Sequence, residues 1–155
     1  GAVKMFYHLD SRVAKDGELY GFLRLGTDFN ENYYEIQIPL KVSPVFVGMG
    51  TDEVWPEENT IDLSLNELYA LKAQRDRESY PLTQPYPQNF KQVGRHLLRI
   101  VGRPDLSDVR LMMIGLRNPK SQGNQPLSGC LWANELRVTD FNRQAGWAVN
   151  SMATA

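Results

Sequence analysis

The sequence predicts an all-β domain with one short helix, arranged as an antiparallel β-sandwich. Short segments in which apolar and polar residues alternate recur through most of the chain, a period that is typical of half-buried antiparallel strands. Loops rich in Pro, Gly, Asn and Asp separate them, and about eight such strands favour a sandwich. The length of 155 residues fits a single domain.

The first half of the chain contains the clearest strand patterns. Residues 2–9, 19–26 and 32–42 alternate, and Pro39 predicts that the third strand lies at an edge or ends there. Residues 44–59 are expected to form a short strand and then a loop, and residues 60–65 form the next strand. The apolar residues that alternate on the core faces are Val3, Met5, Tyr7, Leu9, Tyr34, Ile36, Ile38, Leu40, Ile61, Leu63 and Leu65.

One helix interrupts the strands. Leu65, Leu68 and Leu71 recur at helical spacing, and Ser64 with Glu67 has the spacing of a capping box, so a helix is predicted over residues 65–77. Residues 80–90 contain three prolines and are predicted to form a loop.

Three strands, at residues 94–102, 108–118 and 129–138, complete the domain. In the last of them, alternation predicts one core face, made of Cys130, Trp132, Asn134, Leu136 and Val138. Cys130 then acts as a small apolar residue and Trp132 as a core anchor. Asn134 is interpreted as a structural hydrogen-bonding residue, since a buried amide is costly unless it is paired and no second polar residue shares its face.

Charge and composition exclude several partners. A net charge of −1 and scattered Arg and Lys residues argue against nucleic-acid binding. No apolar run approaches the ~18 residues of a transmembrane helix. We predict one domain over residues 1–145 and a separate tail over residues 146–155.

Catalytic and metal-binding chemistry is poorly represented. The histidines, His8 and His96, stand in strand patterns without an evident nucleophile beside them, so the protein is not expected to be an enzyme or to need a cofactor. Asp28, Asn30 and Asn32 carry the oxygen ligands that calcium prefers, but such residues also form turns, and both interpretations remain open.

Aromatic residues in loop-like segments suggest a possible binding surface. Trp55, Tyr80, Tyr86 and Phe90 are candidates for a sugar-binding platform; the alternative is that they pack the loops onto the sandwich. The last three predicted strands resemble the end of jelly-roll domains of the carbohydrate-binding-module type, which ranks a jelly roll above an immunoglobulin-like sandwich.

Four longer blocks resemble one known family in combination. They are "FLRLGTDFNENYYEIQIPLKVSP" (22–44), "VWPEENTIDLSLNELYALKAQRD" (54–76), "VGRPDLSDVRLMMIGLRNP" (101–119) and "LWANELRVTDFNRQAGWA" (131–148). They are similar to segments of the SprA/Sov family, the outer-membrane translocon of the Bacteroidetes type IX secretion system, which is linked to gliding motility.

The resemblance implies a non-catalytic structural or interaction domain of this translocon, at the cell surface or on the periplasmic face of the outer membrane. Its implied partners are the parent β-barrel, secreted cargo and other translocon components. It also implies that residues from about 146 onward begin a barrel strand and pack poorly here or pair with another molecule. The competing hypothesis is a carbohydrate-binding jelly-roll module.

Overall fold

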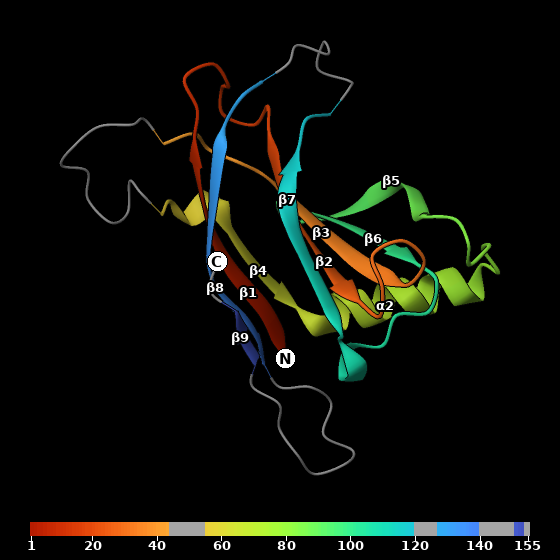
Figure 1. Ribbon diagram of the computed structural model, residues 1–155. Helices are drawn as coiled ribbons and strands as arrows, with labels where there is room; N and C mark the ends of the chain where they lie inside the picture. Colours follow the sequence, from red (N-terminus) through yellow and green to blue (C-terminus); the bar gives the residue numbers. More distant parts are fainter. Residues whose placement is uncertain (44–54, 120–126, 140–150, 154–155) are drawn as a thin grey trace.

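The protein folds as two antiparallel β-sheets packed face to face (Figure 1). The computed structural model describes residues 1–43, 55–119, 127–139 and 151–153. The described strands are β1 (Ala2–Asp10), β2 (Tyr20–Gly26), β3 (Tyr33–Pro39), β4 (Thr60–Ser64), β5 (Tyr86–Val93), β6 (His96–Val101), β7 (Leu111–Arg117), β8 (Cys130–Thr139) and β9 (Ser151–Ala153). The described helices are α2 (Leu65–Arg77) and the short 3-10 helices η1 (Glu57–Asn59) and η2 (Leu106–Asp108). The predicted all-β sandwich with one helix is confirmed, while the start of the strand expected after residue 43 lies outside the described residues.

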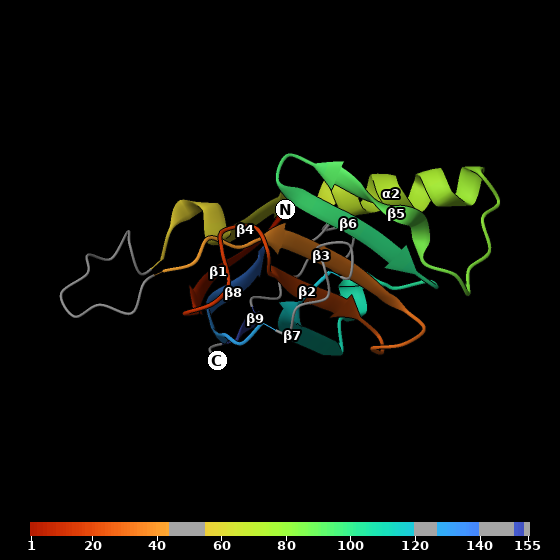
Figure 2. The same cartoon turned by 90° about the horizontal axis from the view of Figure 1, so that it is seen from above.

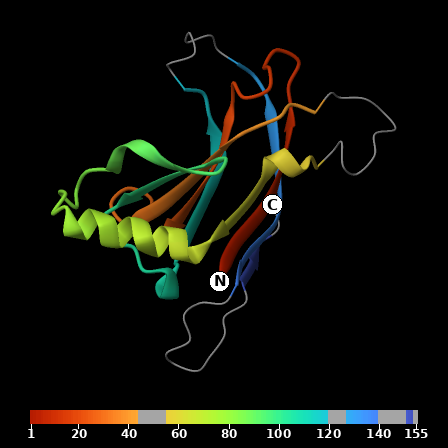
Figure 3. The same ribbon diagram turned by 180° about the vertical axis from the view of Figure 1, so that it is seen from behind.

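The two sheets differ in size and in the strands they take from the chain. In the described residues the four-stranded sheet has the order β4-β1-β8-β9, and the five-stranded sheet has the order β5-β6-β3-β2-β7. Figure 2 shows the two layers from above, and Figure 3 shows them as the sides of a wedge with α2 across its open side. The chain changes sheet after β1, β3, β4 and β7, which places β1 beside the closing strand β8.

The core lies between the sheets and follows the predicted alternation. Every second residue of β1 is fully buried, as are the inward residues of β2, β3 and β6. The Tyr7 hydroxyl donates a hydrogen bond to the Phe22 carbonyl oxygen (2.7 Å), which ties β1 to β2 across the core. Each fully buried side chain of this kind contributes about 1.5–3 kcal/mol. These core residues are Val3, Met5, Tyr7, Leu9, Leu23, Leu25, Tyr34, Ile36, Ile38, Leu98 and Ile100.

Helix α2 covers the gap between β4 and the β5–β6 edge of the other sheet. It spans the predicted residues, and the Ser64 side chain caps it by accepting a hydrogen bond from the Asn66 N–H (3.3 Å). Leu65, Leu68 and Leu71 are buried on its inner stripe. Among the described residues, no helix combines the length and apolar character needed to span a membrane.

Strand β8 contains a β-bulge that the sequence pattern did not reveal. Phe6 pairs with Asn134 and Lys4 with Arg137, so β8 has one residue more than β1 between these two pairs. Glu135, within the extra stretch, has a φ of 53°. A bulge of one residue switches all later side chains to the opposite face of the sheet.

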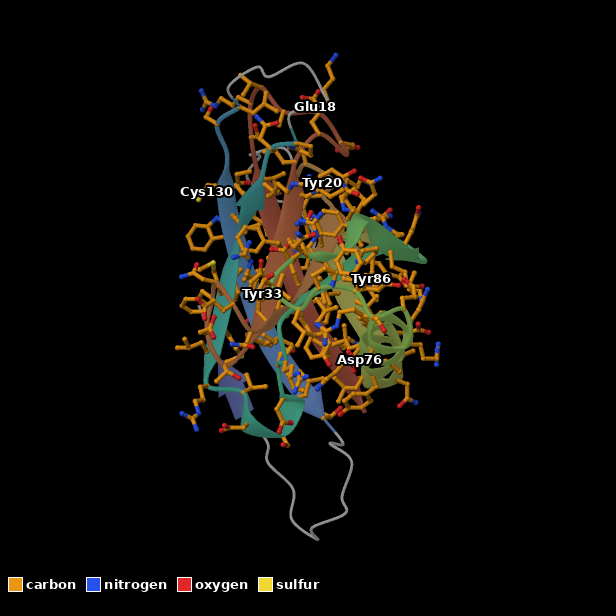
Figure 4. All side chains as sticks on the ribbon, turned by 90° about the vertical axis from the view of Figure 1, so that its right-hand side faces the viewer. Glu18, Tyr20, Tyr33, Asp76, Tyr86 and Cys130 are labelled. Atoms are coloured by element: carbon orange, nitrogen blue, oxygen red, sulfur yellow. The ribbon has the colours of Figure 1, made fainter. Side chains whose placement is uncertain are left out.

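The bulge corrects the prediction for the core face of β8. Ala133 lies inward before the bulge, and Leu136 and Val138 lie inward after it. Trp132 is 55% exposed and Cys130 is exposed, so the prediction that they belong to the core is wrong. Figure 4 shows Cys130 at the margin of the fold. The half-buried Asn134 shares this outer face, and its structural hydrogen bond stays a prediction.

Strand β5 occupies a segment that was predicted to be a loop. It contains Pro87, but it lies at the edge of its sheet, where a missing N–H costs no ladder hydrogen bond. Its register with β6 shifts between Tyr86 and Lys91. The loop prediction for this part of residues 80–90 is therefore wrong, because the edge position made the proline tolerable.

The predicted C-terminal tail is described only in part. Residues 151–153 form β9 and pair with residues 136–138 of β8 in the same chain, whereas the resemblance implied that residues from about 146 onward pack poorly or pair with another molecule. Residues 140–150 lie outside the described part of the chain. The domain boundary at residue 145 stays a prediction.

The Asn59 side-chain amide pins two segments of the chain together. Asn59 is fully buried. Its Oδ1 accepts from the Lys41 N–H (2.7 Å), and its Nδ2 donates to the Lys41 carbonyl oxygen (2.8 Å). One side chain thus satisfies both backbone groups of a residue beyond the end of β3.

Candidate functional site

Aromatic side chains gather on the outer face of the four-stranded sheet, and Trp132 is the exposed one among them. This tryptophan face consists of Phe6, His8, Trp55 and Trp132. Phe6 and His8 alternate with the core residues of β1, and Trp132 lies opposite His8 in the β1–β8 register. Trp55 comes from the segment before η1, and its ring centroid lies 5.8 Å from that of His8.

His8 is held within this face by a carboxylate. Its Nε2 lies 2.7 Å from Asp10 Oδ1, two residues along the same strand. The residue is only 9% exposed, because the Trp55 ring lies against it. This packing leaves Trp132 as the most exposed aromatic side chain of the tryptophan face.

The outer face of the five-stranded sheet has a different chemistry. We call Arg24, Glu35, Gln37, Arg99 and Arg117 the arginine face. Arg24, Glu35 and Arg99 stand directly opposite one another on β2, β3 and β6. Tyr20 and Tyr33 mark the two ends of this side of the sheet in Figure 4.

Hydrogen bonds join the arginine face into a network. Arg24 Nε donates to Glu35 Oε1 (2.6 Å), and Gln37 Nε2 donates to Glu35 Oε2 (2.9 Å). Arg117 Nη1 donates to Gln37 Oε1 (2.7 Å). Glu35 is 3% exposed and Gln37 is 2% exposed, so β3 is buried on both of its faces.

Aromatic rings hold the guanidinium groups in place. The Arg24 guanidinium carbon lies 4.3 Å from the Tyr33 ring centroid. Those of Arg99 and Arg117 lie 3.8 and 5.1 Å from the Phe90 centroid. Such cation–π contacts contribute about 0.5–2 kcal/mol each and fix the orientation of the planar group.

The three arginines are close enough to influence one another. Burial lowers the pKa of Arg99 below its usual range, Glu35 and Tyr33 oppose that shift, and Arg117 and Arg24 add to it as like charges. Arg99 Nε is buried and has no hydrogen-bond partner among the described residues. A buried donor without a partner is a cost to folding.

The four predicted platform aromatics do not come together. Trp55 belongs to the tryptophan face and Phe90 stacks on the arginines of the other sheet. Tyr80 and Tyr86 pack edge to face at 5.0 Å, and the Tyr86 hydroxyl donates to Glu78 Oε2 (2.9 Å). The structure therefore places these residues at three separate locations.

The weak calcium candidate, Asp28 with Asn30 and Asn32, uses its carboxylate oxygens in hydrogen bonds within its own turn. Asp28 Oδ1 accepts from the N–H groups of Asn30 (3.0 Å), Glu31 (2.5 Å) and Asn32 (3.1 Å), and Asp28 Oδ2 accepts from Asn32 Nδ2 (2.9 Å). These hydrogen bonds lower the pKa of Asp28 to about 2. The arrangement favours the turn interpretation, and no group of metal-ligating acids, histidines or cysteines was found in the described ranges.

A cavity of about 420 Å³ lies beside this turn. Asn32 Oδ1, at its wall, accepts from the Arg103 N–H (2.9 Å), so part of its polar lining is already paired. Neither a histidine nor a cysteine is among the described residues that line it.

His96 has a structural position between the sheets. Its Nε2 accepts from the Asp62 N–H of β4 (3.1 Å), and its Nδ1 lies 3.2 Å from the Val93 carbonyl oxygen. Both contacts suit a neutral ring that is protonated at Nδ1. Burial is the main cause of its lowered pKa.

The arginine face was missed by sequence reasoning. The sequence carries one indication of this face. Arg24, Arg99 and Arg117 each follow a leucine in a strand, so they alternate with the core residues and point to the outer side. They come from β2, β6 and β7, and only the order of the strands in the sheet shows that they share a face.

Fold and surface together define an antiparallel β-sandwich domain whose two outer faces present aromatic and arginine side chains. A family model described as "Motility related/secretion protein", SprA_N, matches residues 2–155. The chain belongs to this family, in agreement with the SprA/Sov resemblance of its four blocks. A search of curated proteins gave no match.

Proposed function

We propose that this domain is a non-catalytic interaction domain of a large outer-membrane translocon that serves type IX secretion and gliding motility. Membership of a motility and secretion family supports this class of function. The domain would contact the remainder of its parent barrel, secreted cargo or other translocon components, on the extracellular or periplasmic side of the outer membrane.

The observation that carries the proposal is the exposure of Trp132. Tryptophan offers a large apolar area for binding and is enriched among the residues that dominate interface energies. Trp132 lies on β8 opposite His8 of β1, so a strand that is hydrogen-bonded to its neighbour presents it. The half-buried Phe6 and Trp55 extend the apolar surface beside it.

The absence of catalysis is part of the proposal. His96 uses both ring nitrogens in structural contacts, and His8 is bonded to Asp10 and packed against Trp55. These arrangements support a structural role for both histidines.

Site-specific photo-crosslinking in the parent protein tests the proposal. A photoreactive residue at position 132 should crosslink to another part of the parent or to a second protein. The control is position 13, because Val13 is equally exposed (56%) but lies outside both faces. Equal crosslinking yields at the two positions would contradict a specific role for the tryptophan face.

The exposed Trp132 also favours a second candidate, a carbohydrate-binding module. A flat indole on a sheet face suits stacking against a sugar ring. In affinity electrophoresis through gels that contain soluble polysaccharides, this candidate expects the wild-type chain to be retarded and Trp132→Ala to migrate freely. Migration of the wild-type chain at its sugar-free rate argues against it.

A further inference from the structure

We propose that the arginine face binds an extended, acidic peptide segment of a partner protein through the carboxylates of that segment. The site is distinct from the tryptophan face, since it lies on the outer side of the other sheet. The inference is independent of the secretion role, because it rests on the charges and donors of the five-stranded sheet alone.

The first argument is charge. Arg24, Arg99 and Arg117 bring three positive charges to one face, and Glu35 supplies one negative charge within the network. Both Glu35 oxygens are already occupied, by Arg24 and Gln37. The face therefore keeps a local positive excess in a chain whose net charge is −1.

The second argument is unused hydrogen-bonding capacity. A guanidinium has five N–H donors. In the described part of the chain, Arg117 donates through Nη1 to Gln37, and Arg99 donates through Nη2 to the Gln88 carbonyl oxygen (2.8 Å). Arg99 Nε remains buried without a partner. A ligand that accepts hydrogen bonds can use the remaining guanidinium N–H groups of this pair.

The third argument is geometry, which favours a carboxylate. The Arg99 and Arg117 guanidiniums both lie against the Phe90 ring, and the planar fork of a guanidinium matches the two oxygens of a carboxylate. The face already binds one carboxylate, because Arg24 Nε donates to Glu35 Oε1 (2.6 Å) while its guanidinium lies over Tyr33.

The fourth argument is the surroundings, which favour a peptide over a polyanion. Half-buried Phe22 and Met113 and the 39% exposed Leu111 stand on the same face as the arginines. An extended peptide presents every second side chain to one side, so acidic residues can meet arginines while their neighbours meet apolar groups. Nucleic-acid sites instead rely on extended basic patches, and the net charge of −1 argues against such a patch in this chain.

Binding to the full 155-residue chain can be measured by isothermal titration calorimetry. The probe is a capped peptide of alternating glutamate and serine. The control peptide has the same sequence with glutamine in place of glutamate. We expect binding of the glutamate peptide only. Arg99→Gln and Arg117→Gln should each weaken it about tenfold or more, since hydrogen bonds between charged groups are the stronger kind. Arg117→Lys should recover only part of the affinity, because lysine keeps the charge and loses the fork.

The control variant is Arg77→Gln, since Arg77 is an exposed arginine near the end of α2. It should bind the peptide as the wild type does, and urea unfolding should show that all variants are folded. The proposal is overturned if the glutamate peptide does not bind, if Arg77→Gln weakens it as much as Arg117→Gln does, or if inorganic phosphate or a DNA oligonucleotide binds more tightly than the peptide.

Discussion

Gly102 offers the sharpest test of how the loop after β6 is held. Its φ is +68°, and an added Cβ would collide with the Glu31 carbonyl oxygen and the Asn32 side chain. Its N–H donates to the Leu82 carbonyl oxygen (2.9 Å), and its own carbonyl oxygen accepts from the buried Arg75 guanidinium. Any shift that relieves the collision therefore disturbs a buried arginine.

Gly102→Ala should lower the free energy of unfolding by about 2–4 kcal/mol. The left-handed backbone costs alanine about 1 kcal/mol, and disturbing a buried hydrogen bond adds about 1–3 kcal/mol. Gly94→Ala is the matched control, because Gly94 has a φ of +59° but nothing within 4 Å of an added Cβ. It should lose at most about 1 kcal/mol. Equal losses in urea unfolding would refute the role assigned to the collision.

Three further outcomes follow from burial and hydrogen bonding. Asn59→Ala should cost about 2–3 kcal/mol in urea unfolding because it removes the partner of the Lys41 N–H and carbonyl oxygen from a fully buried position. Asn66→Ala, at an exposed position, should change little; similar losses would contradict the role of Asn59 in joining the two segments. Trp132→Ala should lower the free energy of unfolding by less than about 1 kcal/mol, and Leu136→Ala should lower it by about 2–5 kcal/mol. A larger loss for Trp132→Ala than for Leu136→Ala would contradict the assignment of Trp132 to the outer face. Burial lowers the pKa of His96 below 6.5, so its stabilising contribution is present above that pH and is lost as the pH falls. His96→Gln should flatten the pH dependence of unfolding below about pH 6.5, and an unchanged slope would refute this.

The parts of the fold that could be predicted are those governed by local pattern. Strand β1 and helix α2 were found because an unbroken alternation and a capped leucine stripe depend on neighbouring residues alone. The bulge at Glu135 could not be found in this way, because it is defined by how β8 pairs with β1. Pro87 led to the wrong prediction of a loop for a related reason, since a proline is tolerated in β5 only because β5 lies at the edge of its sheet.

The candidate surfaces, too, could be predicted only where they depend on neighbouring residues and not on strand pairing. Trp132 was singled out from the sequence, but its face was assigned wrongly because the alternation was assumed to run through the bulge. Arg24, Arg99 and Arg117 are far apart along the chain, and the strand order of the sheet brings them together. Asn59 gave no local signal, because its partner Lys41 lies 18 residues away.

Secretion by cells that carry Trp132→Ala in the parent protein tests the proposed function most directly. The amount of secreted cargo and the gliding speed are measured at matched levels of the folded parent, with Val13→Ala as the equally exposed control. We expect Trp132→Ala to reduce both and Val13→Ala to leave both unchanged. Wild-type secretion and gliding in the Trp132→Ala cells would contradict the assignment of the tryptophan face as the contact surface.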